Sequence, residues 1–289
     1  MKIVARLKTI SEIEKLINLG VDVFLVDTPL AVKKIEDQVF SSLEAIKKTS
    51  KEIYLLANKM IHQEDLEELR KLLIIAKKHQ INGIVVGDIT AMIIAKELGI
   101  ENKIIYQPGT MNTSSFDSEY FKEKSIKGIT ISKEITIEEI ERFFTNKQIE
   151  LSLIGHGYLD MFYSKRKLLT NYFIYKGIKR TLITDNYCFR LKEEIRDKSN
   201  YPIFEDYSGT HIFRDKALES FSEFKVLSKG IDVFFVERIF LTDEEYYEAL
   251  AAYNNLEKAE AFLNKYGDNY NKGFYYQYTE KLKGDLNEN

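Results

Sequence analysis

Short apolar runs alternate with amphipathic segments along most of the chain. The clearest helical segment covers residues 63–78, where leucines share one side of a helix. Capping-box pairs, Ser11 with Glu14 and Thr136 with Glu139, mark the start of two further helices. The other expected helices cover residues 41–48, 90–98, 217–227 and 243–266. The expected strands cover residues 2–7, 21–27, 53–57, 83–87, 103–106, 128–131, 150–154 and 233–236. This alternation predicts a parallel sheet with helices outside it.

One sequence unit occurs twice, near the two ends of the chain. Residues 20–27 read G-V-D-V-F-L-V-D, and residues 230–237 read G-I-D-V-F-F-V-E. Two such helix-to-strand units fit a barrel whose first and last strands are neighbours. We therefore predict an α/β fold of the TIM-like β/α-barrel type, in which the barrel could be incomplete or distorted. An open parallel sheet is the alternative.

The regular alternation stops after His156, and residues 157–210 contain few recognisable elements. An insertion of this length inside a compact domain is more often functional than structureless. We expect a barrel domain over residues 1–241 that includes this insertion before its last strand. A C-terminal helical segment with an aromatic tail would occupy residues 242–289.

Polar residues resume where the expected strands end. In a β/α barrel the ligand-binding face lies at these carboxyl ends. Asn58, Gln107 and Glu237 are therefore candidates for substrate binding, unless they only mark the ends of buried strands. The full set of strand-end polar residues is Asp27, Asn58, Asp88, Gln107, His156 and Glu237.

Composition narrows the class of protein. The chain has 289 residues, a net charge of −3 and a single cysteine. One cysteine excludes a disulfide framework and an all-cysteine metal site within this chain. The sequence has no apolar run long enough for a membrane helix, and its start reads as a strand. We expect a soluble cytoplasmic protein without membrane or DNA partners, in which any nucleic-acid contact is local.

One local patch is basic and aromatic. The segment between Met161 and Thr184 contains no acid and interleaves aromatic residues with basic ones. Lysine and arginine neutralise phosphates, and aromatic rings stack on unpaired bases, so the segment could bind single-stranded RNA. The alternative is a solvated basic helix whose aromatic side chains face the core. The basic residues are Lys165, Arg166, Lys167, Lys176, Lys179 and Arg180.

Catalytic candidates are few. His156 could act as a general base, or it could be a histidine held by hydrogen bonds at a strand end. Glu205, Asp206 and His211 could bind a cation or orient a polar substrate, but their spacing matches no metal motif. The sequence contains neither G-x-S-x-G nor H-E-x-x-H, so we expect no self-sufficient protease and no resident metal.

Four motifs resemble those of a known family. Residues 201–213 read Y-P-I-F-E-D-Y-S-G-T-H-I-F, similar to Y-P-(I/V)-x-E-D-x-x-G-T-Y-I. Residues 53–58 look like the segment V-Y-V-T-V-N, and residues 107–113 resemble a strand-end loop with Asn112 at its later asparagine. Residues 156–167 resemble the signature H-G-A-L-C-I-A-Y-S-G-R-C. Together, and in their order along the chain, these motifs resemble those of the collagenase-like peptidase family U32.

The departures from the family pattern are informative. Characterised members bind a four-iron, four-sulfur cluster through cysteines of the signature, but here Asp160 and Lys167 stand at the two cysteine positions. Glu219 replaces a further cysteine, whereas Lys216 matches the lysine of a K-D-L motif. We therefore expect no cluster in this chain, because a cluster needs about four soft ligands. Asp160 and Lys167 could instead form an ion pair. The resemblance adds Asn112 and Lys216 to the substrate-binding candidates.

The resemblance leaves three classes of function open. Some family members modify RNA, and a pair of paralogues is required for 5-hydroxylation of the wobble uridine of tRNA. A short chain without a cluster would then bind tRNA or act as a scaffold beside a cluster-bearing paralogue. The second class is a collagenase-like peptidase, and the third is a non-catalytic barrel that binds a small molecule. The sequence alone does not show whether the chain is an enzyme.

Overall fold

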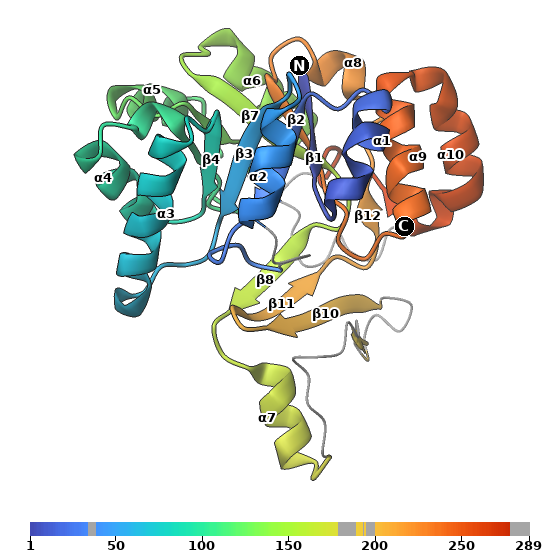
Figure 1. Cartoon of the computed structure of the whole chain (residues 1–289). Helices are drawn as coiled ribbons and strands as arrows, with labels where there is room; N and C mark the ends of the chain where they lie inside the picture. The colour runs from blue at the N-terminus through green and yellow to red at the C-terminus, as the bar shows by residue number, and fades with distance from the viewer. Residues whose placement is uncertain (34–38, 179–188, 193, 195–199, 278–289) are drawn as a thin grey trace.

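The fold is a closed barrel of eight parallel strands (Figure 1). The computed structural model describes residues 1–33, 39–178, 189–192, 194 and 200–277. The first strand pairs with the last, with Lys2 opposite Val233 and Ala5 opposite Val236, which confirms the predicted closed barrel. The barrel strands, in spatial order, are β1 (Lys2–Arg6), β13 (Val233–Val236), β7 (Glu150–His156), β6 (Gly128–Thr130), β5 (Ile104–Tyr106), β4 (Gly83–Val86), β3 (Glu52–Ala57) and β2 (Val23–Asp27).

Both faces of the barrel strands are buried, which explains why the strands read as continuous apolar runs. Along β2, Val23 and Leu25 pack in the cluster inside the barrel, whereas Phe24 and Val26 pack against the surrounding helices. The interior of the barrel is therefore filled by side chains, and space for a ligand is left only at its ends.

Helices cover the outside of the barrel. On α3, the buried residues Leu69, Leu72, Leu73 and Ala76 form one face, as the leucine spacing predicts. The capping box of Thr136 with Glu139 is confirmed at the start of α6. The outer helices are α1 (Ile13–Asn18), α2 (Val39–Lys47), α3 (Leu66–Lys78), α4 (Ile89–Glu97), α5 (Phe116–Glu123), α6 (Ile137–Thr145) and α8 (Phe224–Leu227).

Two helix predictions are wrong in detail. The first helical segment begins earlier than predicted, with a 3-10 turn (η1, Ile10–Glu12) that uses Thr9 and Glu12 as its capping box. The helix predicted over residues 217–227 is only α8 at its end. Its first two residues form strand β12 (Ala217–Leu218), because they pair with β14 (Tyr270–Asn271) from the C-terminal segment.

The C-terminal segment forms two helices, α9 (Asp243–Asn254) and α10 (Ala259–Tyr266), separated by a 3-10 turn. They lie beside α1 at one side of the barrel (Figure 1). Tyr246, Leu250 and Tyr253 of α9 belong to the same hydrophobic cluster as the barrel helices. The division of the chain at residue 241 stays a prediction. None of the described helices is long and apolar enough to cross a membrane.

The described part of the predicted insertion contains regular secondary structure. It forms an antiparallel sheet in the order β8-β11-β10-β9, with α7 following β8. Figure 1 shows this sheet below the barrel, with α7 projecting farthest away. We call these five elements the arm. They are β8 (Asp160–Ser164), α7 (Leu168–Tyr175), β9 (Phe189–Leu191), β10 (Tyr201–Asp206) and β11 (Gly209–Phe213).

Candidate functional site

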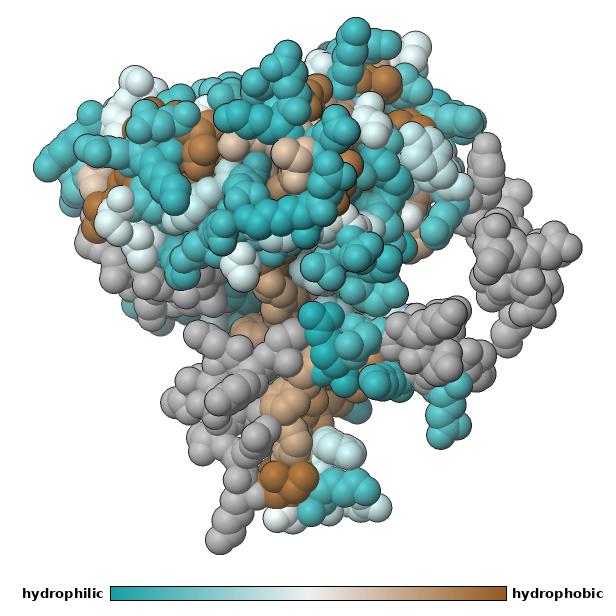
Figure 2. All heavy atoms as spheres, turned by 90° about the vertical axis from the view of Figure 1, so that its right-hand side faces the viewer, coloured by the Kyte–Doolittle hydropathy of each residue, from teal (hydrophilic) through white to brown (hydrophobic). Residues whose placement is uncertain are grey.

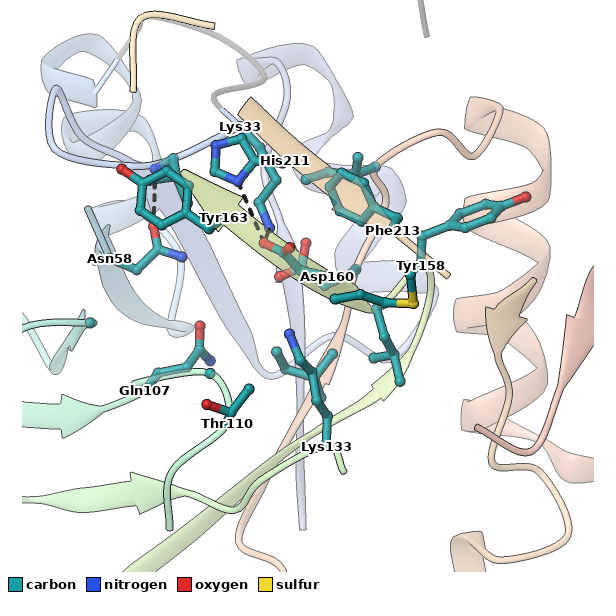
Figure 3. A pocket seen from close by; sticks show the side chains of 18 of the residues that line it. Lys33, Asn58, Gln107, Thr110, Lys133, Tyr158, Asp160, Tyr163, His211 and Phe213 are labelled. Carbon is teal, nitrogen blue, oxygen red and sulfur yellow. Dashed lines mark hydrogen bonds and ion pairs between the residues drawn. The ribbon is translucent and has the colours of Figure 1, made fainter. Parts of the chain in front are cut away.

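A cavity of about 390 Å³ lies at the carboxyl ends of the barrel strands, between the barrel and the arm (Figure 3). Its volume falls within the range of small-molecule sites. The barrel contributes residues at or directly after the ends of β1, β3, β4, β5 and β13, and the arm contributes residues of β8 and β11. The polar residues that line the cavity are Arg6, Lys33, Asn58, Asp88, Gln107, Thr110, Lys133, Tyr158, Asp160, Tyr163, His211 and Glu237.

The structure brings together four of the six strand-end polar residues, namely Asn58, Asp88, Gln107 and Glu237. A fifth, Asp27, does not line the cavity but holds a residue that does. Its carboxylate accepts hydrogen bonds of 2.7 and 2.9 Å from the buried guanidinium of Arg6. Arg6 also lies 3.5 Å from Glu237, so these three charges form a fixed network below the cavity. Sequence reasoning missed Arg6 because it lies inside an expected strand.

His156 is the sixth strand-end residue, and the structure contradicts its role as a candidate base. The side chain is fully buried outside the barrel wall, where its ring packs against Tyr253 and Phe262 of the C-terminal helices. Its Nδ1 atom lies 3.2 Å from the hydroxyl of Tyr253. Burial lowers the pKa of His156 to about 3, so the ring is neutral at physiological pH. A group enclosed in this way cannot reach a substrate in the cavity.

A β-bulge at Gly155 explains this placement. Phe235 of β13 pairs with Ile154, but Val236 pairs with His156, so Gly155 is an extra residue in β7. The extra residue inverts the alternation of side chains. Ile154 therefore lines the cavity, whereas His156 faces the helices. A Cβ at Gly155 would lie 1.9 Å from the ring of Phe234, so the bulge needs glycine.

Two of the other catalytic candidates are structural. The carboxylate of Glu205 accepts hydrogen bonds from the backbone N–H groups of Leu169 and Thr170 and from Thr210 Oγ1, and so anchors the first turn of α7. Asp206 accepts a hydrogen bond of 3.0 Å from the backbone N–H of Lys33 and so joins the arm to the barrel. Neither residue lines the cavity.

The remaining candidate, His211, does line the cavity. Its ring stacks on Tyr163 at 4.6 Å, and its two nitrogens lie 3.0 Å from Ser208 Oγ and 3.5 Å from Asp160 Oδ2. This is the order of a Ser-His-Asp triad. However, Ser208 is buried, does not line the cavity and donates its hydroxyl to Asp206 at 2.5 Å. The hydroxyl of Ser208 therefore does not donate its proton to His211, and a substrate in the cavity cannot reach it. Both are needed for a serine nucleophile.

Charged groups of opposite sign meet between the carboxyl face of the barrel and the arm. Asp160 Oδ2 pairs with Lys33 Nζ at 2.8 Å, so Lys33, and not Lys167 as the signature suggested, is its ion-pair partner. Burial alone would raise the pKa of Asp160, but Lys33, His211 and Lys133 together hold it below its usual range. Burial lowers the pKa of Lys133. Lys133 follows an expected strand and could have been found by the strand-end rule, whereas no sequence signal indicates Lys33.

The two candidates added by the family resemblance lie outside the cavity. Asn112 is buried, and its amide donates a hydrogen bond of 3.0 Å to the carbonyl of Thr130. This hydrogen bond ties the loop after β5 to the end of β6. Lys216 is exposed at the base of the arm. The structure therefore gives neither residue a contact with a ligand in this cavity.

The basic candidates lie on the arm. Lys165 is half-buried and lies 3.7 Å from Glu64, whereas Arg166 is exposed. Lys176 lies over the rings of Tyr172 and Tyr175 at the far end of α7. Figure 2 shows hydrophobic and hydrophilic atoms mixed on the surface of the arm. Lys167 is half-buried where α7 begins, and Lys179 and Arg180 lie outside the described residues.

The residues of this chain do not fit the iron–sulfur cluster that the family resemblance implies. Such a cluster needs about four thiolates, but the sequence contains only Cys188, which lies outside the described residues. At one signature position the carboxylate of Asp160 is already paired with Lys33. Within the described part of the chain, no three His, Cys, Asp or Glu side chains form a group that could hold a metal.

The fold and the site together define a β/α-barrel protein with a ligand-sized cavity at its carboxyl face, covered by an inserted arm. The chain belongs to peptidase family U32, whose sequence model matches residues 30–283.

Individual relatives have different names. The tRNA hydroxylation protein P2 of Bacillus subtilis is 27% identical over an alignment of 253 residues that covers 84% of this chain and 81% of that protein. A collagenase of Porphyromonas gingivalis is 22% identical over 77% of this chain and 58% of its own length. The solved structure of a U32 peptidase covers 82% of this chain and 92% of its own, with 13% identity and a TM-score of 0.47.

Proposed function

We propose that this chain is a subunit of a system that hydroxylates the wobble uridine of tRNA. It binds the RNA or acts as a scaffold, and a cluster-bearing paralogue supplies the chemistry. The similarity to a tRNA hydroxylation protein supports the reaction. The lack of cluster ligands in this chain supports the division of roles.

The arm carries the proposal, because it is basic, aromatic and exposed. Tyr175 is 82% exposed and Tyr172 is 53% exposed on α7, where a ring contributes nothing to the core. Lys176 beside these rings and Arg166 at the start of the helix can neutralise phosphates. Exposed rings next to cations are typical of surfaces that stack unpaired bases and follow a phosphate backbone. The alternative from the sequence, with the aromatic residues facing the core, applies on α7 to Phe173 but not to Tyr172 or Tyr175.

A genetic experiment tests the reaction. Deletion of the gene is expected to remove 5-hydroxylation of the wobble uridine, measured by mass spectrometry of tRNA nucleosides. Expression of the wild-type chain from a plasmid should restore it. Unchanged hydroxylation after deletion would overturn the proposed function.

A binding experiment tests the arm. Reversal of charge at Arg166 and Lys176 (R166E with K176E) is expected to weaken tRNA binding about tenfold at low salt and less at high salt, because fewer counterions are released. The matched control reverses Lys48 and Lys78, which are exposed where α2 and α3 end, on the face of the barrel away from the arm. Equal losses in the two variants would show that net charge, and not the arm, binds the RNA.

The division of roles has its own measurement. The purified chain is expected to contain no stoichiometric iron after anaerobic reconstitution. A cluster at one per chain would contradict the assignment of the chemistry to a partner.

A further inference from the structure

Hydrogen bonds fix the orientation of two side-chain amides that line the cavity. Each amide keeps one hydrogen-bonding group that can face a ligand. Asn58 Oδ1 accepts a hydrogen bond of 3.0 Å from the backbone N–H of Val32, which leaves its amide N–H₂ as a donor. Gln107 uses its N–H₂ group toward Thr130 at 3.4 Å, which leaves its carbonyl oxygen as an acceptor. Both amides line the cavity from the barrel side (Figure 3).

A second pair of groups comes from the other side. Asp160 Oδ1 is buried and has no hydrogen-bond partner, because only Oδ2 contacts Lys33. The ammonium group of Lys133 lines the cavity without an ion pair among the described residues, and Figure 3 shows it pointing toward Asp160. A buried acceptor that is left unpaired costs free energy until a ligand or water satisfies it.

These groups define a ligand by its hydrogen-bonding edge. The cavity offers a carboxylate, which only accepts, next to donors from Lys133 and Asn58. The edge of uracil presents one N–H flanked by carbonyl oxygens, so it can donate to a carboxylate while a carbonyl oxygen accepts from a donor such as Lys133. Cytosine presents an unprotonated nitrogen at the central position and would face the carboxylate with a lone pair. The rings of Tyr158 and Tyr163 and the side chain of Met161 complete the lining with apolar surface suited to a planar ring.

We infer that this cavity receives a uracil base turned out of a single-stranded RNA, with Asp160 accepting its N3–H and Lys133 donating to a flanking carbonyl oxygen. The inference rests on the proposed function, because it requires that the chain bind RNA. The arm links the two sites: β8 carries Asp160 and Tyr163, and the basic residue Arg166 follows three positions after Tyr163. A strand bound along the arm is thereby brought to the cavity.

The test uses the full chain and an RNA hairpin with a single uridine in its unpaired loop. The loop uridine is replaced in turn by cytidine and by an abasic site, and binding is measured by fluorescence anisotropy. The wild-type chain is expected to bind the uridine hairpin about tenfold more tightly than either replacement, as for the loss of one hydrogen bond to a charged group. With 4-thiouridine in the loop, a photochemical cross-link is expected in β8 or at Lys133, located by mass spectrometry.

Two variants separate recognition from folding. Asp160→Asn can donate as well as accept, so it is expected to lose the preference for uridine over cytidine while it still binds the hairpin. Lys216→Met removes an exposed charge that lies outside the cavity, so it is expected to keep the preference. Thermal unfolding of both variants shows whether each is folded.

The outcomes distinguish the two claims. If uridine, cytidine and abasic hairpins bind equally while the arm variant R166E with K176E still weakens binding, the cavity inference is overturned and the proposed function stands. A preference that survives Asp160→Asn would also overturn the inference. If no hairpin and no tRNA bind, both claims fail.

Discussion

His156 and His211 are both completely buried, yet they lie in two regions with different chemistry. His156 is enclosed by aromatic rings from the C-terminal helices and has one hydrogen-bond partner, a tyrosine. His211 stacks on one ring and has a serine and a carboxylate beside its nitrogens. Burial lowers the pKa of both, although Asp160 opposes this effect at His211. The difference teaches that the neighbours of a buried histidine, and not its burial, separate a core residue from a site residue.

The largest expected effect tests His156 as part of the core. His156→Ala removes a ring from a closely packed aromatic cluster and should lower the free energy of unfolding by about 3 kcal/mol, measured by urea denaturation. His79→Ala is the matched control, because His79 lies partly exposed at the end of α3, and its effect should stay within about 0.5 kcal/mol. Similar losses in the two variants would contradict the core role.

The next effect concerns the region of His211, where a single carboxylate organises the arm. Glu205→Ala removes the acceptor for the first N–H groups of α7 and should speed amide hydrogen exchange in this helix by an amount equivalent to about 2 kcal/mol. Exchange in the barrel strands should not change, because the hydrogen-bond partners of Glu205 among the described residues all lie in the arm. A uniform loss of protection over the whole chain would show that arm and barrel unfold as one unit.

The lowered pKa of His156 predicts that the free energy of unfolding depends on pH in the acid range. The folded chain keeps His156 neutral down to about pH 3, whereas the unfolded chain binds a proton below about 6.5, so stability falls as the pH drops through this window. His156→Gln should reduce this slope by about 1.4 kcal/mol per pH unit, measured by denaturation at several pH values. Parallel pH curves for the variant and the wild type would contradict the lowered pKa.

The smallest effect tests the triad-like arrangement. Ser208→Ala should lower stability by only about 1 kcal/mol, through the hydrogen bonds lost to Asp206 and His211. A fluorophosphonate probe should label neither the wild type nor the variant, because Ser208 is buried away from the cavity. If the probe labels the wild type but not Ser208→Ala, Ser208 is a reactive nucleophile, and the peptidase alternative is supported.

The sequence predicts the barrel well because the signals are local and repeated. Each strand is a buried apolar run, and the repeated unit indicates that β1 and β13 meet, as they do. The strand-end rule finds Asn58, Gln107 and Glu237 at the cavity for the same reason. The error at residues 217–227 has a non-local cause, since β12 forms only because β14 returns to pair with it.

The site is predicted less completely than the fold, because the arm closes it through contacts that are distant in sequence. Lys33 reaches Asp160 across 127 positions, and no pattern around Lys33 announces this pair. Arg6 is hidden in an apolar strand and becomes visible only through its contact with Asp27. His211, Asp160 and Ser208 come together because β8 and β11 pair, which periodicity within each segment does not show.

The extra residue in β7 has a consequence for how related chains are compared. Side chains alternate between the two faces of a strand, and the extra residue Gly155 shifts this alternation by one position. An alignment that keeps the histidine in its column but lacks the extra residue would describe a chain whose imidazole turns into the barrel. Two family members with the same motif letters at this point can therefore present opposite side chains to the ligand.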